Sequence, residues 1–272
     1  MAKIITITSG KGGVGKTTIT ANLGTALALL GKQVCLIDAD FGLSNLDIPL
    51  GLSNRIVFDL SDYMNERCEL HHVEIKDKYL PNLSLIPCSK SHGHTHTPEA
   101  FKNIVENLAN SYDYVLIDSP AGIESGFQNA ANAADEAIVV VTPYLSSIHD
   151  ADRVIGILED TMSFSPKVIL NMIEEDERKA QSLKMASKEN IMSILQLEEL
   201  GVVLNDSEVI RSIERGCPIA LSPQEENGLR FRHIARNIIA DQYEPYVPLK
   251  LKKKRSSIFP FQQKLRWISG RM

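Results

Sequence analysis

The segment Ser9–Thr18 constrains the fold most, because it reads Ser-Gly-Lys-Gly-Gly-Val-Gly-Lys-Thr-Thr between an apolar, strand-like run and a helical pattern. Its four glycines let the backbone curl tightly and point successive N–H groups at one anion. The following helix adds the positive end of its dipole. The spacing from Gly10 to Thr17 is that of a phosphate-binding P-loop, and a glycine-rich turn without a ligand is the alternative.

The side chains of this loop predict nucleotide chemistry. Lys16 supplies a point charge for the β and γ phosphates, and the Thr17 hydroxyl is placed to bind Mg²⁺. Lys11 adds a second charge, although on spacing alone it can also be a solvated loop lysine. The expected nucleotide contacts are Lys11, Gly12, Gly13, Val14, Gly15, Lys16, Thr17 and Thr18.

Short β-branched runs alternate with helical patterns along the rest of the chain. The expected strands are Ile4–Thr8, Gln33–Ile37, Leu83–Ile86, Tyr114–Ile117, Ala137–Val141, Val168–Leu170 and Val202–Leu204. The expected helices lie at about 16–30, 99–110, 124–134, 147–160, 188–197, 207–215 and 225–240. This alternation predicts an α/β fold with a doubly wound, mostly parallel sheet and ligands outside the carboxyl ends of the strands.

Carboxylates follow two of the expected strands. Asp38 and Asp40 come directly after one strand, and Asp118 comes after another. In a parallel sheet these positions face the same crevice as the P-loop. Phosphoryl transfer needs a metal near the phosphate oxygens and a residue that orients the attacking water, which suits these acids. Turn or N-cap aspartates are the alternative.

With these residues in place, the chain resembles the septum site-determining MinD family of deviant Walker A ATPases over nearly all its length. The segments that carry the resemblance are SGKGGVGKTT, DADFGLSNLDIPLGL, NRIVFDL, IDSPAGIESG and VTPYLSSIHDADRVIGIL, together with a basic amphipathic tail. The resemblance implies an ATP- and Mg²⁺-dependent homodimer on the inner membrane face that positions the division site. It also implies recruitment of a MinC-like division inhibitor and control by a MinE-like or MinJ/DivIVA-type partner.

The resemblance also assigns roles to single residues. It implies that Lys11 reaches the nucleotide of the partner subunit and that Asp40 orients the hydrolytic water, so that Lys11, Lys16 and Asp40 form the catalytic set. It implies metal contacts from Thr17, Asp38 and Asp118. It places a nucleotide-sensitive partner surface at Ser147, Asp150 and Asp152, where a helix cap and a solvated face are the alternative. The base pocket departs from the family pattern, and Asn171 and Asp206 remain as candidates there.

Charge is divided unevenly along the chain. Residues 250–272 carry eight basic residues and no acid, so the remaining body has 21 basic against 34 acidic residues, a net charge of −13 within an overall −5. Phe261, Leu265 and Ile268 fall on one helical stripe flanked by Trp267, which is typical of a helix lying in a membrane interface. A disordered basic tail, a helix docked on the acidic body and a nucleic-acid arm are the alternatives. We expect an ATPase domain at 1–245, a basic linker at 246–257 and a membrane helix at 258–272.

Cysteines, targeting segments and histidines reduce the number of function classes that fit the sequence. Four dispersed cysteines, no secretory signal and no run of 18 apolar residues favour a cytoplasmic protein that does not span a membrane. The resemblance implies that it is peripheral on the inner face of the cell membrane. The missing CxxC pair argues against an iron–sulfur carrier. The His92–His96 histidines are expected in a surface loop rather than in a metal site. A ParA-like or flagellar-number positioning ATPase, and a nucleotide-bound scaffold with negligible turnover, remain open.

Overall fold

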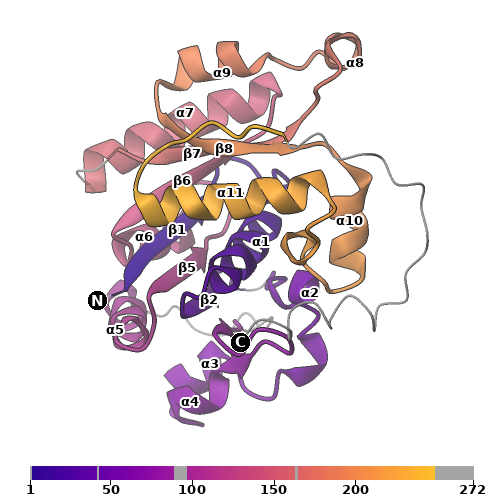
Figure 1. Cartoon of the computed structure of the whole chain (residues 1–272). Coiled ribbons are helices and arrows are strands. Elements are labelled where there is room, and N and C mark those ends of the chain that lie inside the picture. Colours follow the sequence, from indigo (N-terminus) through magenta and orange to yellow (C-terminus); the bar gives the residue numbers. More distant parts are fainter. Residues whose placement is uncertain (1, 42, 89–96, 163–164, 249–272) are drawn as a thin grey trace.

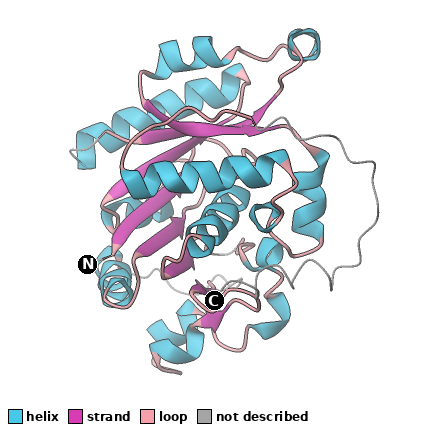
Figure 2. Ribbon diagram, in the orientation of Figure 1, coloured by secondary structure: helices cyan, strands magenta, loops and turns pink. Residues whose placement is uncertain are grey.

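The described residues of this computed structural model, 2–41, 43–88, 97–162 and 165–248, build a sheet with helices on both faces (Figures 1 and 2). The strands are β1 Lys3–Thr8, β2 Val34–Asp38, β3 Ile75–Lys76, β4 Leu83–Ile86, β5 Tyr114–Asp118, β6 Glu136–Val141, β7 Lys167–Ile173 and β8 Glu198–Leu204. Their order is β3-β4-β2-β5-β1-β6-β7-β8. All pairs are parallel except β3 with β4, so the expected doubly wound sheet is confirmed.

The longer helices occur where helical periodicity predicts them. They are α1 Lys16–Leu29, α5 Pro98–Ala109, α6 Ser125–Asn132, α7 Leu145–Met162, α9 Lys188–Leu195, α10 Ser207–Glu214 and α11 Glu226–Ala240. The short helices α2 Asp47–Leu50, α3 Leu60–Met64, α4 Leu70–Val73 and α8 Glu177–Ser182, and the 3₁₀ turns Ser53–Arg55 and Ile219–Leu221, were not predicted. One or two turns are too short to show a period, and local caps such as Asp59 and Asp176 define α3 and α8 instead.

Alternate residues of the central strands face opposite layers. Ile5 and Ile7 of β1 pack in the core shared with α1 and α11, whereas Ile4 packs toward α5. A third cluster joins β6 and β7 to α7 and α9. The strands are therefore covered on both faces, which explains their nearly continuous apolar sequences. None of the helices in the described ranges has the length and apolar character needed to cross a bilayer.

Candidate functional site

The P-loop lies between the end of β1 and the start of α1. Gly13 and Gly15 have φ angles of 78° and 94°, a left-handed conformation that glycine adopts without the strain a Cβ would add. A Cβ on Gly15 would lie 2.4 Å from Nδ2 of Asn171, and one on Gly10 would lie 2.1 Å from the carbonyl oxygen of Asp150. Gly15 is thus required both by the turn and by the close approach of β7, and Gly10 is required by the close approach of α7.

Lys16 points into the loop. Its side chain is largely buried, and Nζ donates to Ser9 Oγ at 3.1 Å, while the Ser9 hydroxyl donates to the Lys11 carbonyl at 2.8 Å. Burial lowers the pKa of Lys16, and the carboxylates of Asp118 and Asp40 oppose that shift. The ammonium group is therefore held beside the curled backbone and faces two acids, where a phosphate group would be attracted.

Lys11 has different surroundings, because it is exposed and leaves the loop on the side of α7. Its Nζ donates to Ser146 Oγ at 3.0 Å, in the first turn of that helix. In the single chain this lysine is thus bound to its own α7. Ser9 and Ser146 were not among the predicted site residues, since serines give no motif signal until the loop is folded against them.

Asp38 is a buried carboxylate that organises the loop after β2. It accepts hydrogen bonds from the backbone N–H groups of Asp40, Asn45 and Leu46 at 3.0–3.1 Å and from the Ser44 hydroxyl at 2.8 Å. Burial raises the pKa of Asp38, and these hydrogen bonds oppose the increase. The structure therefore gives Asp38 a loop-ordering role, in addition to its expected place near the metal.

Asp118 lies opposite Asp38 in the register of β2 and β5. It accepts hydrogen bonds from the hydroxyls of Thr17 and, at 3.2 Å, Thr20, both on α1. Burial and the neighbouring Asp38 raise the pKa of Asp118 to about 7. Asp40 is half-buried and interacts electrostatically with Lys16. The P-loop and the three predicted acids are thus brought to one edge of the sheet.

The donor set fits Mg²⁺. Thr17, Asp38 and Asp118 offer hard oxygen ligands, which this cation prefers. Two buried carboxylates directly across a strand pair repel each other, and a divalent cation beside Thr17 would offset that repulsion.

The two residues expected at the base pocket lie at the ends of neighbouring strands. Asn171 in β7 is buried and its Nδ2 donates to the carbonyl oxygen of Val14 at 2.8 Å, so it supports the P-loop directly. The next residue, Met172, has a left-handed φ of 58°. Asp206 follows β8 and caps α10 by accepting from the Glu208 N–H at 2.9 Å. Both side chains therefore have structural bonds within the chain.

The expected partner surface needs one correction. Ser147 is only 4% exposed, and its Oγ accepts from the Thr142 N–H at 3.1 Å, so it ties α7 to the end of β6 rather than facing outward. Asp150 is partly exposed and Asp152 is exposed on the same helix. Helical periodicity alone did not separate the inward from the outward positions of the first turn. The predicted membrane residues Phe261, Leu265, Trp267 and Ile268 lie outside the described residues.

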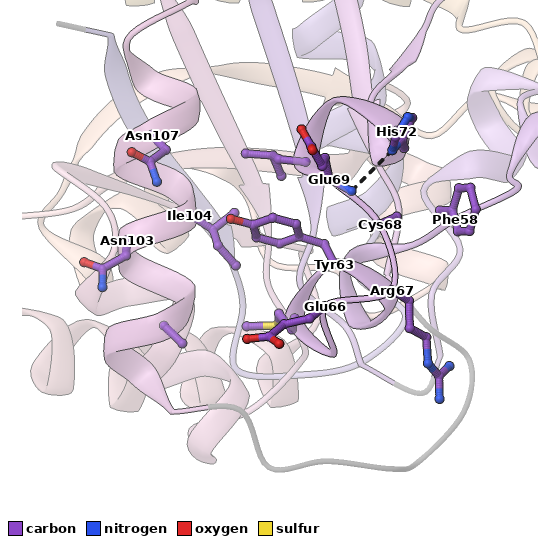
Figure 3. Close-up of a pocket in the computed structure, with 13 residues that line it drawn as sticks. Phe58, Tyr63, Glu66, Arg67, Cys68, Glu69, His72, Asn103, Ile104 and Asn107 are labelled. Atoms are coloured by element: carbon purple, nitrogen blue, oxygen red, sulfur yellow. Dashed lines mark hydrogen bonds between the residues drawn. The ribbon is translucent and has the colours of Figure 1, made fainter.

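A cavity of about 1060 Å³ lies between α3, α4 and α5, and its lining includes Tyr63, Cys68, Ile104 and Asn107 (Figure 3). None of its lining residues belongs to the P-loop or to the acids around it. Lys16, Thr17 and the carboxylates instead converge at the P-loop edge of the sheet.

Comparison with known proteins agrees with this geometry. Residues 2–165 match the family described as an AAA domain. The chain is 44% identical over 259 residues to the septum site-determining protein MinD of Bacillus subtilis, covering 94% of each chain. It is similar, with a TM-score of 0.81 and 45% identity, to a chain of the MinC:MinD cell division protein complex of Aquifex aeolicus, covering 92% of this chain and 99% of that one. It is also similar, with a TM-score of 0.78 and 28% identity, to Pyrococcus horikoshii MinD complexed with Mg-ADP, covering 88% and 96%.

The fold and the site together define a P-loop ATPase of the α/β class, with its nucleotide loop between β1 and α1. The identities above extend beyond that loop, over nearly the whole chain. The chain belongs to the MinD family of septum site-determining proteins. The expectation of a septum-positioning ATPase is thereby confirmed.

Proposed function

We propose that the chain works as an ATP-dependent dimer whose nucleotide state decides when it binds the membrane and recruits a division inhibitor. The observation that carries the proposal is the contrast between the two lysines of one loop. Lys16 is buried in its own cradle, whereas Lys11 is exposed and its ammonium group donates to Ser146. A lysine that its own cradle does not use is free to exchange Ser146 for the phosphates of a second subunit.

Within each site the residues divide the work. The backbone N–H groups of Gly12–Thr18 and the Lys16 ammonium bind the β and γ phosphates. Thr17 and Asp118, with Asp38 beside them, hold Mg²⁺, which supplies charge neutralisation on the phosphate oxygens. Asp40 orients the attacking water, while Asn171 and Asp206 flank the base. The Mg-ADP complex of the Pyrococcus horikoshii relative supports ATP and Mg²⁺ as the ligands.

The dimer acts on other partners through two further regions. Residues 246–257 link the ATPase domain to an amphipathic helix at 258–272, which lies in the anionic inner face of the cell membrane. Each Lys or Arg near such a leaflet contributes roughly 1 kcal/mol before screening, so one short tail binds marginally and two bind together. Asp150 and Asp152 on α7 contribute to the surface for a MinC-like inhibitor. The MinC:MinD complex of the Aquifex aeolicus relative supports MinC as the kind of partner. A MinE-like or MinJ/DivIVA-type partner would control location.

The test separates dimerisation from membrane binding. The Asp40→Ala variant, which should bind ATP without rapid turnover, is expected to elute as a dimer with ATP and as a monomer with ADP. Adding Lys11→Ala should leave it monomeric in both, because the cross-subunit contact is lost. Sedimentation with phosphatidylglycerol vesicles should follow the same pattern, and Phe261→Glu should remove sedimentation without removing the dimer. Equal vesicle binding with ATP and ADP, or a dimer that survives Lys11→Ala, would refute the proposal.

A further inference from the structure

Within the described residues, helix α11 carries the chain away from the P-loop. At the start of α11, Asn227 exchanges hydrogen bonds of 2.8 and 3.1 Å with the backbone of Leu204, the final residue of β8. Past its other end, Asp241 forms ion pairs with Lys167 at 2.7 Å and Lys3 at 3.5 Å, the first residues of β7 and β1. Helix α11 therefore runs from the carboxyl edge of the sheet, where the P-loop lies, to the amino edge.

Residues 241–248, here called the return segment, bring the chain back. Asp241 has a left-handed φ of 50°, which reverses the chain at the end of α11. Farther on, Glu244 exchanges backbone hydrogen bonds with the Asn237 side chain at 3.1 and 3.3 Å, and its carbonyl oxygen lies 2.6 Å from His233 Nε2. The contacts thus move toward the start of α11 as the return segment proceeds, and Figure 1 shows it running alongside that helix.

Near the end of the return segment, Tyr246 packs on Arg230 and His233 of α11, and this contact is here called the clasp. The Arg230 guanidinium lies over the Tyr246 ring, with its Cζ 4.7 Å from the ring centroid. The His233 ring meets the Tyr246 ring edge-on, with 5.4 Å between the two centroids. Arg230 is 8% exposed and pairs with Glu226 at 3.2 Å and with Glu175 at 2.9 Å. Glu175 lies two residues beyond the end of β7, so the clasp is at the carboxyl edge of the sheet.

We propose that the return segment positions the C-terminal tail at the nucleotide edge of the molecule, and that Tyr246 is the positioning residue that keeps it there. This inference rests on the proposed membrane function. With the clasp closed, the tails of a dimer joined at its P-loops both start from the joined edge. With the clasp open, each tail starts from the far end of α11, on roughly 8 additional residues that span up to about 27 Å. The two tails then reach one membrane patch at a lower effective concentration.

The experiment compares three variants of the full chain. Tyr246→Ala should bind phosphatidylglycerol vesicles about three- to tenfold more weakly than wild type in ATP, because the tethers are longer. Its ATP hydrolysis without vesicles should be unchanged, and its Glu244 amide should exchange hydrogen faster, since the bond to Asn237 is released. Tyr246→Phe keeps the ring on Arg230 and should match wild type. Val247→Ala, at a neighbouring position that is 75% exposed, is the control for any change in this segment.

The outcomes separate this inference from the proposed function. If wild type binds vesicles equally with ATP and ADP, the membrane switch itself fails. If wild type shows the switch but Tyr246→Ala binds vesicles as tightly despite faster Glu244 exchange, the position of the tail is irrelevant and the inference is overturned. Unchanged Glu244 exchange in Tyr246→Ala would show that Tyr246 is not the clasp, which also overturns it.

Discussion

Lys11 and Lys16 have the same charge and lie in one loop, yet the fold gives them different surroundings. Lys16 is enclosed by Ser9, Asp118 and Asp40. Lys11 is exposed, and its ammonium group donates to Ser146 of α7. The acids show a similar division, because Oδ2 of Asp38 accepts three hydrogen bonds from its own loop, whereas Asp40 remains half-buried beside Lys16. Residue type thus predicts that lysines and aspartates bind the phosphates and the metal. Their neighbours in the fold decide which lysine and which aspartate take each role.

Gly15 permits a sharp prediction at the residue scale. Gly15→Ala should weaken nucleotide binding at least about tenfold, because a Cβ at 2.4 Å from Asn171 Nδ2 forces the P-loop or the asparagine to move. The left-handed φ adds about 1–2 kcal/mol of backbone strain. Titration of a fluorescent ATP analogue measures the affinity, and thermal unfolding measures the stability.

Gly31→Ala is the matched control, because Gly31 has a φ of 84° but no atom within 4 Å of an added Cβ. Both variants should lose stability through the left-handed φ, and only the Gly15 variant should also lose nucleotide affinity. Equal nucleotide affinity in both would contradict the role assigned to the close approach at Gly15.

At the scale of elements, the short edge strand β3 depends on a polar cluster rather than on β-propensity. Glu74, just before β3, accepts hydrogen bonds from Tyr112 Oη at 2.6 Å and Ser84 Oγ at 2.9 Å and pairs closely with Lys76. Burial alone would raise the pKa of Glu74, but the bonds from Lys76, Tyr112 and Ser84 outweigh it and the pKa is lowered. A two-residue strand has no period to detect, so this edge could not be predicted from sequence.

The lowered pKa of Glu74 sets the sign of a pH effect. The ionised Glu74 carboxylate stabilises the folded state fully above its unfolded pKa of about 4.5. That stabilisation is lost as the pH falls through the lower pKa of Glu74 in the folded state. Glu74→Gln should therefore be less stable than wild type at about pH 7, by about 1 kcal/mol, and the difference should shrink below about pH 4. Urea unfolding across this range measures it. Exposed Glu106→Gln should show no such difference, and a constant gap for Glu74→Gln would contradict the assignment.

At the scale of the whole molecule, charge is segregated between an acidic body and a tail with eight basic residues. We expect truncation after Pro248 to abolish vesicle sedimentation while ATP hydrolysis and the ATP-dependent dimer persist, because no P-loop residue is removed. Binding of the full chain should weaken steeply as salt rises, since surface attraction is screened within about 10 Å at 0.1 M. Salt-independent binding by the full chain, or retained binding by the truncated chain, would place the membrane contact elsewhere.

Local patterns in the sequence were sufficient to predict the P-loop and most of the strands and helices of this protein. Glycine spacing predicted the P-loop, β-branched runs predicted the seven strands that form the body of the sheet, and helical periodicity predicted the longer helices. These features are determined within ten or twenty consecutive residues, where side-chain periodicity reports directly on burial.

Tertiary structure decided what depends on contacts between distant residues. Ser146 receives Lys11 from 135 residues away, Asn171 supports Val14 from 157 residues away, and Ser147 is turned inward by the end of β6. The path of the return segment, which brings Tyr246 onto Arg230, has no periodic signature either. Such contacts follow from how the layers pack, so a P-loop could be predicted from the sequence, but which edge of the molecule the tail leaves from could not.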